Sequence, residues 1–200
     1  MNRPENLVAM VARVPRRFWN VPNTLTVSRL VLAVCVFVNI SSGAYAWALA
    51  IFGLAAVTDA LDGYFARLLK QDTPLGRQLD PLVDKVIVSG SYIYLATIDG
   101  TKVMPWMVTV IVVRELLIQG LRSHLEGKGQ PFGARTTGKL KMLVQCLSIS
   151  AVLLCLAIEP TPPPAWLSIR DLLTWLAVAL TLYSGLIYVW VALPKLRGQA

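Results

Sequence analysis

Four aspartates at helical spacings form the part of this sequence best suited to chemistry. Asp59 and Asp62 are three residues apart, and Asp80 and Asp84 are four apart, so each pair shares one face of a helix. The surrounding residues are apolar, and a carboxylate at the centre of a membrane helix costs about 2.5–3.5 kcal/mol on insertion scales. Hard divalent cations, which take oxygen ligands, would offset this cost. The spacing therefore predicts a site for one or two metal ions, an arrangement that suits phosphoryl transfer.

Small and basic residues accompany the first pair of aspartates. Gly63 and Ala66 follow Asp59 by four and seven residues and extend the same helix face. They lack bulk where a charged ligand would approach the backbone, and the guanidinium of Arg67 suits phosphate oxygens. Carboxylates, metal and arginine together indicate a site for a diphosphate.

The elements that must position these residues are two consecutive helices. Residues 71–76 hold the turn signals that end the first helix and return the chain antiparallel. Each helix can then present two carboxylates to one gap. An Asp–Arg pair or a proton relay would account for one aspartate alone, whereas four in this register favour a metal site.

Residues 59–84 resemble the signature of the CDP-alcohol phosphatidyltransferase family, D-x2-D-G-x2-A-R-x8-G-x3-D-x3-D. The fixed positions are filled by Asp59, Asp62, Gly63, Ala66, Arg67, Gly76, Asp80 and Asp84. The resemblance implies an integral membrane enzyme that uses Mg²⁺ or Mn²⁺, with two ions per site. Such an enzyme moves a phosphatidyl group from CDP-diacylglycerol to an alcohol and releases CMP. Members are typically homodimers.

The resemblance also implies roles for individual residues. Asp59, Asp62, Asp80 and Asp84 would hold the metal, and Asp84 would also take the proton of the acceptor hydroxyl. The residues implied for CDP-diacylglycerol are Gly63, Ala66, Arg67, Thr73 and Gly76 in the motif, and Asn23, Thr26 and Arg29 before it. The second set belongs to a Pro-Asn-x-Leu-Thr-x-x-Arg segment at residues 22–29, which many family members share. Helix capping and a snorkelling arginine are the alternative reading of that segment.

A second set of cations indicates where an anionic acceptor would bind. Its members are Arg114, Arg122, Lys139 and Lys141. Residues 112–116 and 138–141 resemble the branch of the family that uses sn-glycerol 3-phosphate, which is the acceptor we expect. Inositol phosphate, serine and phosphatidylglycerol are the alternatives. Arg114 could instead pair with an acid on another helix, and adjacent Glu115 is not expected to share its face.

Composition indicates an all-α, polytopic membrane protein. The 200 residues are 56% hydrophobic and 15% charged, and the net charge is +8. Because the basic residues lie between apolar segments, membrane lipids and phosphorylated substrates are the expected partners rather than nucleic acid. The three cysteines lie in apolar runs and lack metal-ligand spacing, which argues against a disulfide framework or a zinc site.

The apolar runs predict six transmembrane helices in one membrane domain, residues 21–200. The predicted spans are 24–41, 45–69, 79–98, 104–125, 138–158 and 170–193. Residues 1–20, which are basic with apolar positions at near-helical spacing, predict an interfacial amphipathic helix. Lysine and arginine gather at the N-terminus, in alternate loops and in the tail, so both termini and the active site should face the cytoplasm. The expected location is the bacterial plasma (inner) membrane.

Two readings of other classes compete with an enzyme. A divalent-cation channel or carrier could use the four aspartates as a pathway, but a fixed Arg67 would repel its cargo. A purely structural helical membrane protein leaves the clustered carboxylates without a reason.

Overall fold

The computed structural model describes six helices and the turns between them. It covers residues 21–69, 74–127, 136–158 and 160–196, and side chains are described except at 21–27, 59–82, 84, 126, 136–137 and 195–196. The helices are α2 (Val21–Ser41), α3 (Tyr45–Leu69), α4 (Pro74–Leu95), α5 (Pro105–Gly127), α6 (Thr136–Ala157) and α7 (Pro164–Leu196). These ranges hold no strand, which confirms the all-α prediction for the part of the chain they cover. The predicted interfacial helix at 1–20 lies outside the described residues.

Proline and glycine mark the ends of these helices. Pro74, Pro105 and Pro164 are the first residues of α4, α5 and α7, a position where proline's missing N–H would have no intrahelical partner. Gly43 has a φ of 76°, and the next amide, that of Ala44, donates to the Asn39 carbonyl at 2.9 Å. This glycine cap closes α2 and turns the chain directly into α3.

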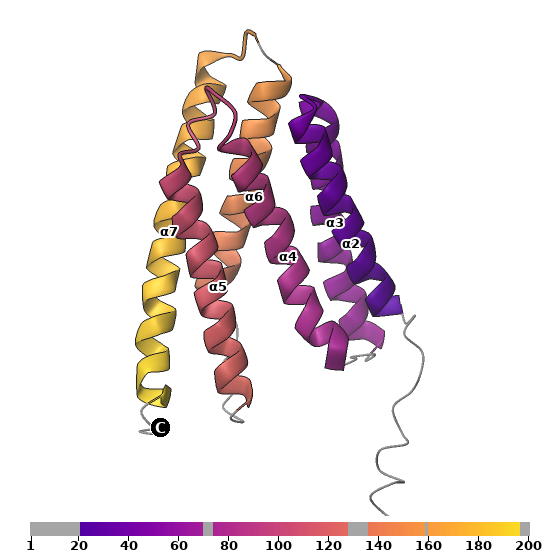
Figure 1. Cartoon of the computed structure of the whole chain (residues 1–200), viewed down its shortest axis with the longest axis vertical. Helices are drawn as coiled ribbons and strands as arrows, with labels where there is room; N and C mark the ends of the chain where they lie inside the picture. The colour runs from indigo at the N-terminus through magenta and orange to yellow at the C-terminus, as the bar shows by residue number, and fades with distance from the viewer. Residues whose placement is uncertain (1–20, 70–73, 128–135, 159, 197–200) are drawn as a thin grey trace, which may run out of the picture.

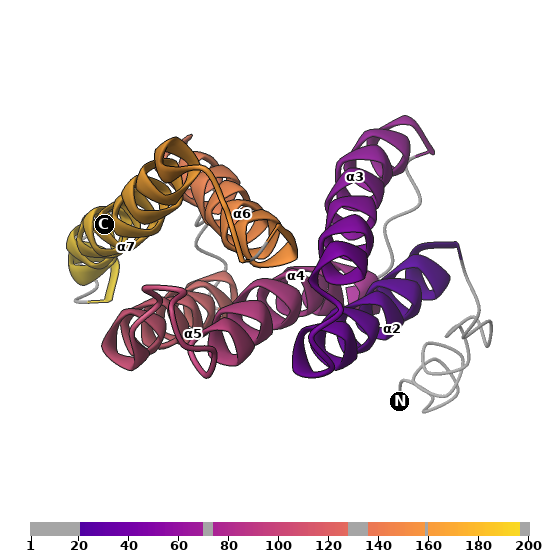
Figure 2. The ribbon, with the colours of Figure 1, turned by 90° about the horizontal axis from the view of Figure 1, so that it is seen from above.

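The helices form three hairpins whose turns lie at the same end of the molecule (Figure 1). α2 packs on α3 and α4, and α5 packs on α4 and α7. α6 packs on α7, α3 and α4, so the ring of helices closes and the α4–α6 contact crosses its middle. Figure 2 shows α4 between the α2–α3 pair and the α5–α6–α7 group. This contact divides the inside of the ring, so that one cavity lies on each side of it.

The apolar core lies toward the end that holds the three hairpin turns. Ile40, Leu95, Met107 and Leu156 belong to this buried cluster. Polar side chains join α6 to α7 beside the core: Gln145 Nε2 donates to Thr181 Oγ1 at 2.9 Å, and the Ser148 and Thr174 hydroxyls lie 3.0 Å apart. In surroundings poor in water, such pairs keep the polar groups satisfied.

The outer surface carries large apolar side chains. Trp190 is 79% exposed and Leu186 is 71% exposed, as expected of side chains that face lipid. Two segments in the described part of the chain, Gly138–Ala157 and Pro164–Pro194, are long and apolar enough to cross a membrane. The remaining predicted spans stay predictions.

The largest differences from the predicted spans are at the N-terminal ends of α4 and α7. α4 begins at Pro74 rather than 79, and α7 begins at Pro164 rather than 170. The extra turn of α4 contains Arg77 and Gln78, which a search for apolar runs leaves out although they continue a helix from an N-terminal proline, whereas the extra residues of α7 are mostly apolar.

Candidate active site

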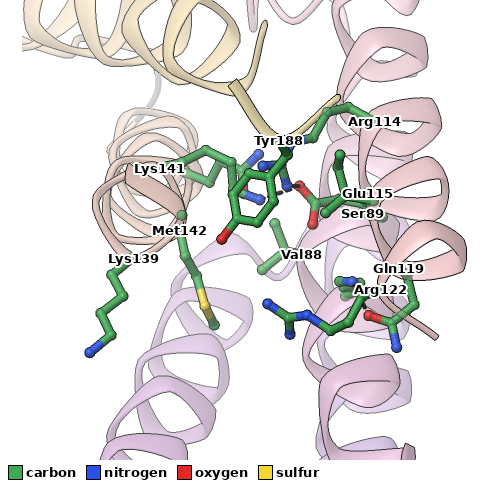
Figure 3. A pocket seen from close by; sticks show the side chains of 14 residues that line it. Val88, Ser89, Arg114, Glu115, Gln119, Arg122, Lys139, Lys141, Met142 and Tyr188 are labelled. Atoms are coloured by element: carbon green, nitrogen blue, oxygen red, sulfur yellow. Dashed lines mark hydrogen bonds and ion pairs between the residues drawn. The ribbon is translucent and has the colours of Figure 1, made fainter. Parts of the chain in front are cut away.

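A cationic cavity lies among α4, α5, α6 and α7. Its volume is about 330 Å³. Among the side chains described as lining it, the cations are Lys85, Arg114, Arg122, Lys139 and Lys141, and the carboxylate is Glu115. The structure thus brings all four residues predicted for the acceptor phosphate to one cavity, together with Lys85. Figure 3 shows these side chains arriving from different helices.

Glu115 forms ion pairs with two of the cations, Arg114 and Lys141. Its Oε1 accepts a hydrogen bond from Lys141 Nζ on α6 and lies 3.2 Å from Arg114 Nη1. The expectation that Glu115 would not share a face with adjacent Arg114 is wrong. Successive helix positions differ in direction, but these long side chains converge toward the same cavity. The acidic partner of Arg114 is therefore its neighbour on α5 and not an acid on another helix, as the alternative reading supposed.

Two arginines keep unused hydrogen-bond donors at this cavity. The Nε atoms of Arg114 and Arg122 are buried, and neither has a hydrogen-bond partner among the described residues. A buried donor without a partner is costly, about 1–3 kcal/mol. An anion entering the cavity would satisfy such groups with charge-assisted hydrogen bonds.

Lys139 and Lys85 complete the set of cations. Lys139 is exposed, whereas Lys141 two residues later is buried, because helix positions two apart point in different directions. In Figure 3 the Lys139 amino group points away from Glu115. Lys85 on α4 donates to Gln119 Oε1 on α5 at 2.6 Å, which fixes its amino group at the cavity wall.

A second, mainly apolar cavity lies among α2, α3, α4 and α6. Its volume is about 300 Å³, and Phe52, Ala55 and Ile87 contribute to its lining. Arg29, which was predicted to bind CDP-diacylglycerol, also lines this cavity. Its side chain is described and is 8% exposed. An apolar space with a buried arginine suits the junction between a lipid and a phosphate.

The two cavities share a wall. Val88, Lys139 and Met142 line both of them. These residues come from α4 and α6, the helices whose contact crosses the bundle. Ligands in the two cavities would therefore be neighbours.

The aspartates of the motif lie on α3 and α4, but their side chains are outside the description. The same holds for Asn23, Thr26, Gly63, Ala66, Arg67 and Gly76, whose backbone is helical, while Thr73 lies wholly outside it. The neighbours of position 84 on α4 are nevertheless described: Val83 lines the apolar cavity and Lys85 lines the cationic one.

The chemistry of the motif fits a hard divalent cation. Its four acidic residues offer oxygen donors, the ligands that Mg²⁺ and Mn²⁺ prefer. The described side chains contain no cluster of three or more His, Cys, Asp or Glu that could hold a metal. Cys35, Cys146 and Cys155 form no disulfide with one another, as the sequence predicted.

Comparisons with known proteins show the family of the chain. The CDP-alcohol phosphatidyltransferase family model matches residues 19–183, and the chain belongs to this family. The CDP-diacylglycerol–glycerol-3-phosphate 3-phosphatidyltransferase of Bacillus subtilis is 35% identical over 195 residues, covering 88% of this chain and 97% of that protein. Proteins of the same name from Cereibacter sphaeroides and Pseudomonas fluorescens are 32% identical over 222 residues and 34% identical over 187 residues. They cover 90% and 89% of this chain, and the chain covers 99% and 92% of their lengths.

Sequence reasoning missed several residues of the cationic cavity. Gln119, Gln145 and Tyr188 line it, and none of them belongs to a motif. Lys85 directly follows Asp84, which was a usable signal for a second basic group beside the motif. Tyr188 had no such signal because it lies on α7, far along the chain from the other lining residues.

Proposed function

We propose that this protein transfers a phosphatidyl group from CDP-diacylglycerol to sn-glycerol 3-phosphate, giving phosphatidylglycerophosphate and CMP. Family membership and the names of the relatives support this activity. Within the structure, the observation that carries the acceptor assignment is the cationic cavity, where Arg114 and Arg122 hold buried donors without described partners. A phosphomonoester with two negative charges is the kind of ligand that such a cavity stabilises.

The acceptor phosphate binds in the cationic cavity. Arg114 and Arg122 supply planar guanidinium groups, and Lys139 and Lys141 add compact charges. Lys141 is also the partner of Glu115, so its charge is partly balanced before any substrate enters. The arginines therefore carry the larger share of phosphate recognition, and Lys139 serves the side that faces the neighbouring cavity.

CDP-diacylglycerol occupies the apolar cavity and the motif next to it. Arg29 lies at this cavity and contacts phosphate oxygens. The remaining proposed contacts are Asn23, Thr26, Gly63, Ala66, Arg67, Thr73 and Gly76. Because the two cavities meet at Val88, Lys139 and Met142, the acceptor hydroxyl and the lipid phosphate come together at this shared boundary.

Helix geometry supports a shared metal site for the four aspartates. α3 ends at Leu69 and α4 begins at Pro74. At a rise of about 1.5 Å per residue, Asp62 and Asp59 lie about 10 and 15 Å before the end of α3. By the same rise, Asp80 and Asp84 lie about 9 and 15 Å after the start of α4. In an antiparallel hairpin the two pairs therefore stand at matching heights.

The chemistry divides between the metal and the protein. Asp59, Asp62, Asp80 and Asp84 would hold Mg²⁺ or Mn²⁺, which would supply positive charge to offset the charge of the diphosphate and of CMP. Asp84 takes the proton from the glycerol hydroxyl as its oxygen forms a bond to the phosphorus that bears diacylglycerol. The bond from that phosphorus to the CMP oxygen breaks, and CMP leaves. The cationic cavity holds the acceptor so that this hydroxyl is the one presented.

The proposal includes how the protein is arranged in the membrane. Six helices cross the bacterial plasma membrane with both termini and the site at the cytoplasmic side, where water-soluble glycerol 3-phosphate is available. The domain comprises residues 21–200, the interfacial helix comprises residues 1–20, and the enzyme is a homodimer.

An acceptor panel tests the proposal. Purified protein in detergent receives CDP-diacylglycerol labelled in its lipid, with Mg²⁺ or Mn²⁺, and one acceptor at a time. The acceptors are sn-glycerol 3-phosphate, inositol phosphate, serine and phosphatidylglycerol. We expect CMP release and labelled product with glycerol 3-phosphate. Efficient turnover with another acceptor in its place would contradict the assignment of the cationic cavity.

A further inference from the structure

We propose that Ser184, Gly185 and Tyr188 of α7 form a cradle that holds Arg114 of α5 in position for the anionic acceptor. This inference deepens the proposed function and rests on it. The three residues lie just beyond the stretch 19–183 that the family model matches. Their spacing of one and four places Ser184 and Tyr188 on the same face of α7.

Ser184 fixes one end of the guanidinium. Arg114 Nη2 donates to Ser184 Oγ at 3.0 Å, and this hydroxyl donates in turn to the Thr181 carbonyl at 3.1 Å. A hydroxyl has one proton to donate. Because that proton is used within α7, the oxygen lone pairs stay directed toward the arginine.

Tyr188 supports the face of the guanidinium. Arg114 Cζ lies 5.5 Å from the centre of the Tyr188 ring, within the range of a cation–π contact. Tyr188 is 3% exposed, so water does not compete strongly for this contact. Figure 3 shows the ring beside the Arg114 side chain at the cavity.

Gly185 leaves room for the arginine stem. A Cβ at this position would lie 3.0 Å from Arg114 Cγ and 3.6 Å from Arg114 Nε. A methyl group there would displace the stem, whose head is held by Ser184 and by Glu115 on the other side. The absence of a side chain at position 185 is therefore part of the arrangement.

The cradle leaves part of the arginine available. Arg114 uses Nη1 for Glu115 and Nη2 for Ser184, while its buried Nε has no partner among the described residues. A guanidinium has five N–H donors, so donors remain for an anion. A long side chain that is already ordered loses little rotamer freedom on binding, which raises affinity without a new contact.

The test separates positioning of Arg114 from general support of the fold. Apparent KM values for glycerol 3-phosphate and for CDP-diacylglycerol are measured for Ser184→Ala, Tyr188→Leu, Tyr188→Phe and Gly185→Ala. We expect Ser184→Ala, Tyr188→Leu and Gly185→Ala to raise the KM for glycerol 3-phosphate about tenfold and to leave the KM for CDP-diacylglycerol within about twofold. Tyr188→Phe keeps the aromatic face and should stay near the original value. Leu186→Ala, at a side chain 71% exposed on the same helix, is the matched control.

A second comparison uses Arg114→Lys as a background. Lysine lacks the fork that Ser184 and Tyr188 hold, so Ser184→Ala and Tyr188→Leu should add little to the KM in that background. If their effects add in full, or if they match Leu186→Ala in the original protein, the cradle is overturned. This comparison decides the matter even if Gly185→Ala does not fold.

Binding of inorganic phosphate distinguishes failure of the cradle from failure of the proposed function. Thermal unfolding of the purified protein in detergent is followed as phosphate is added. The unaltered protein and Leu186→Ala should be stabilised, and Tyr188→Leu should need about tenfold more phosphate for the same shift. That result without glycerol 3-phosphate turnover would support the cradle and overturn the proposed acceptor. Turnover combined with equal phosphate responses in all variants would overturn the cradle alone.

Discussion

Lys141 on α6 forms a buried ion pair with Glu115 on α5. Their side chains are 6% and 7% exposed, and the pair stands at the wall of the cationic cavity. Arg114 shares the same carboxylate. Glu115 therefore keeps two cations close together in a space that would otherwise be strongly repulsive.

Removing either partner of this pair should destabilise the protein unequally. Breaking a buried ion pair by one substitution costs about 3–5 kcal/mol. Glu115→Gln should cost more than Lys141→Met, because Gln leaves two cations facing each other, whereas Lys141→Met leaves Glu115 with Arg114. Thermal unfolding in detergent measures both. The double variant should be less damaged than the sum of the two, and simple additivity would contradict the pairing.

Cations of the acceptor cavity should control the KM for glycerol 3-phosphate. Losing a hydrogen bond to a charged group costs about 1.5–3 kcal/mol, so Arg114→Ala and Arg122→Ala should raise this KM roughly ten- to a hundredfold. Lys139→Ala should have a smaller effect because Lys139 is exposed. The KM for CDP-diacylglycerol should change little, and Lys102→Ala, an exposed cation outside this cavity, is the control. An Arg114→Ala protein that binds CDP-diacylglycerol poorly but saturates normally with glycerol 3-phosphate would contradict the assignment of the acceptor to the cationic cavity.

The motif aspartates should be required for CMP release. Asp59→Ala, Asp62→Ala and Asp80→Ala each remove a proposed oxygen ligand and should reduce CMP release to background. A chelator should have the same effect on the unaltered protein, and added Mg²⁺ or Mn²⁺ should restore activity. Asp99→Ala, at an exposed residue between α4 and α5, should remain active. Full turnover by a motif variant without excess metal would remove that residue from the metal site.

Cysteine labelling tests the six-span topology. The background carries alanine in place of Cys35, Cys146 and Cys155, and a single cysteine is then placed at position 99 or 130. A membrane-impermeant reagent applied to intact cells, or to spheroplasts if an outer membrane is present, should label position 99 and not position 130, because the basic loops are expected inside. Labelling of position 130 from outside only would contradict the orientation.

Gly90→Ala should destabilise the packing of α4 against α2. A Cβ at Gly90 would lie 2.2 Å from Phe37 Cζ, and Phe37 is stacked on Tyr94 at 5.2 Å between ring centres. The ring therefore has a neighbour that resists its displacement, and overpacking of this kind costs about 1–3 kcal/mol. Gly53→Ala, where a Cβ would meet nothing within 4 Å, is the matched control. A Gly90→Ala protein with unchanged thermal unfolding would show that Phe37 moves freely.

The family and the candidate metal ligands are properties of the sequence alone. Asp59, Asp62, Asp80 and Asp84 follow spacings that a helix converts directly into shared faces, since its repeat is local and fixed. The helices themselves follow from long apolar runs interrupted by turn residues, so most of the described boundaries could be predicted. Their N-terminal ends were harder, because polar first turns such as that at Pro74 carry no apolar signal.

Only the tertiary structure decided how the cationic residues are organised. The Glu115–Lys141 pair joins residues 26 apart in the chain, and the Arg114–Ser184 hydrogen bond joins residues 70 apart. Periodicity says which face of a helix a residue occupies, but not which helix that face meets. The placement of Val88, Lys139 and Met142 between two cavities likewise depends on α4 crossing α6. Packing between distant helices thus selected Glu115 as a partner of the cations and brought Tyr188 to Arg114, because these contacts exist only once the bundle has closed.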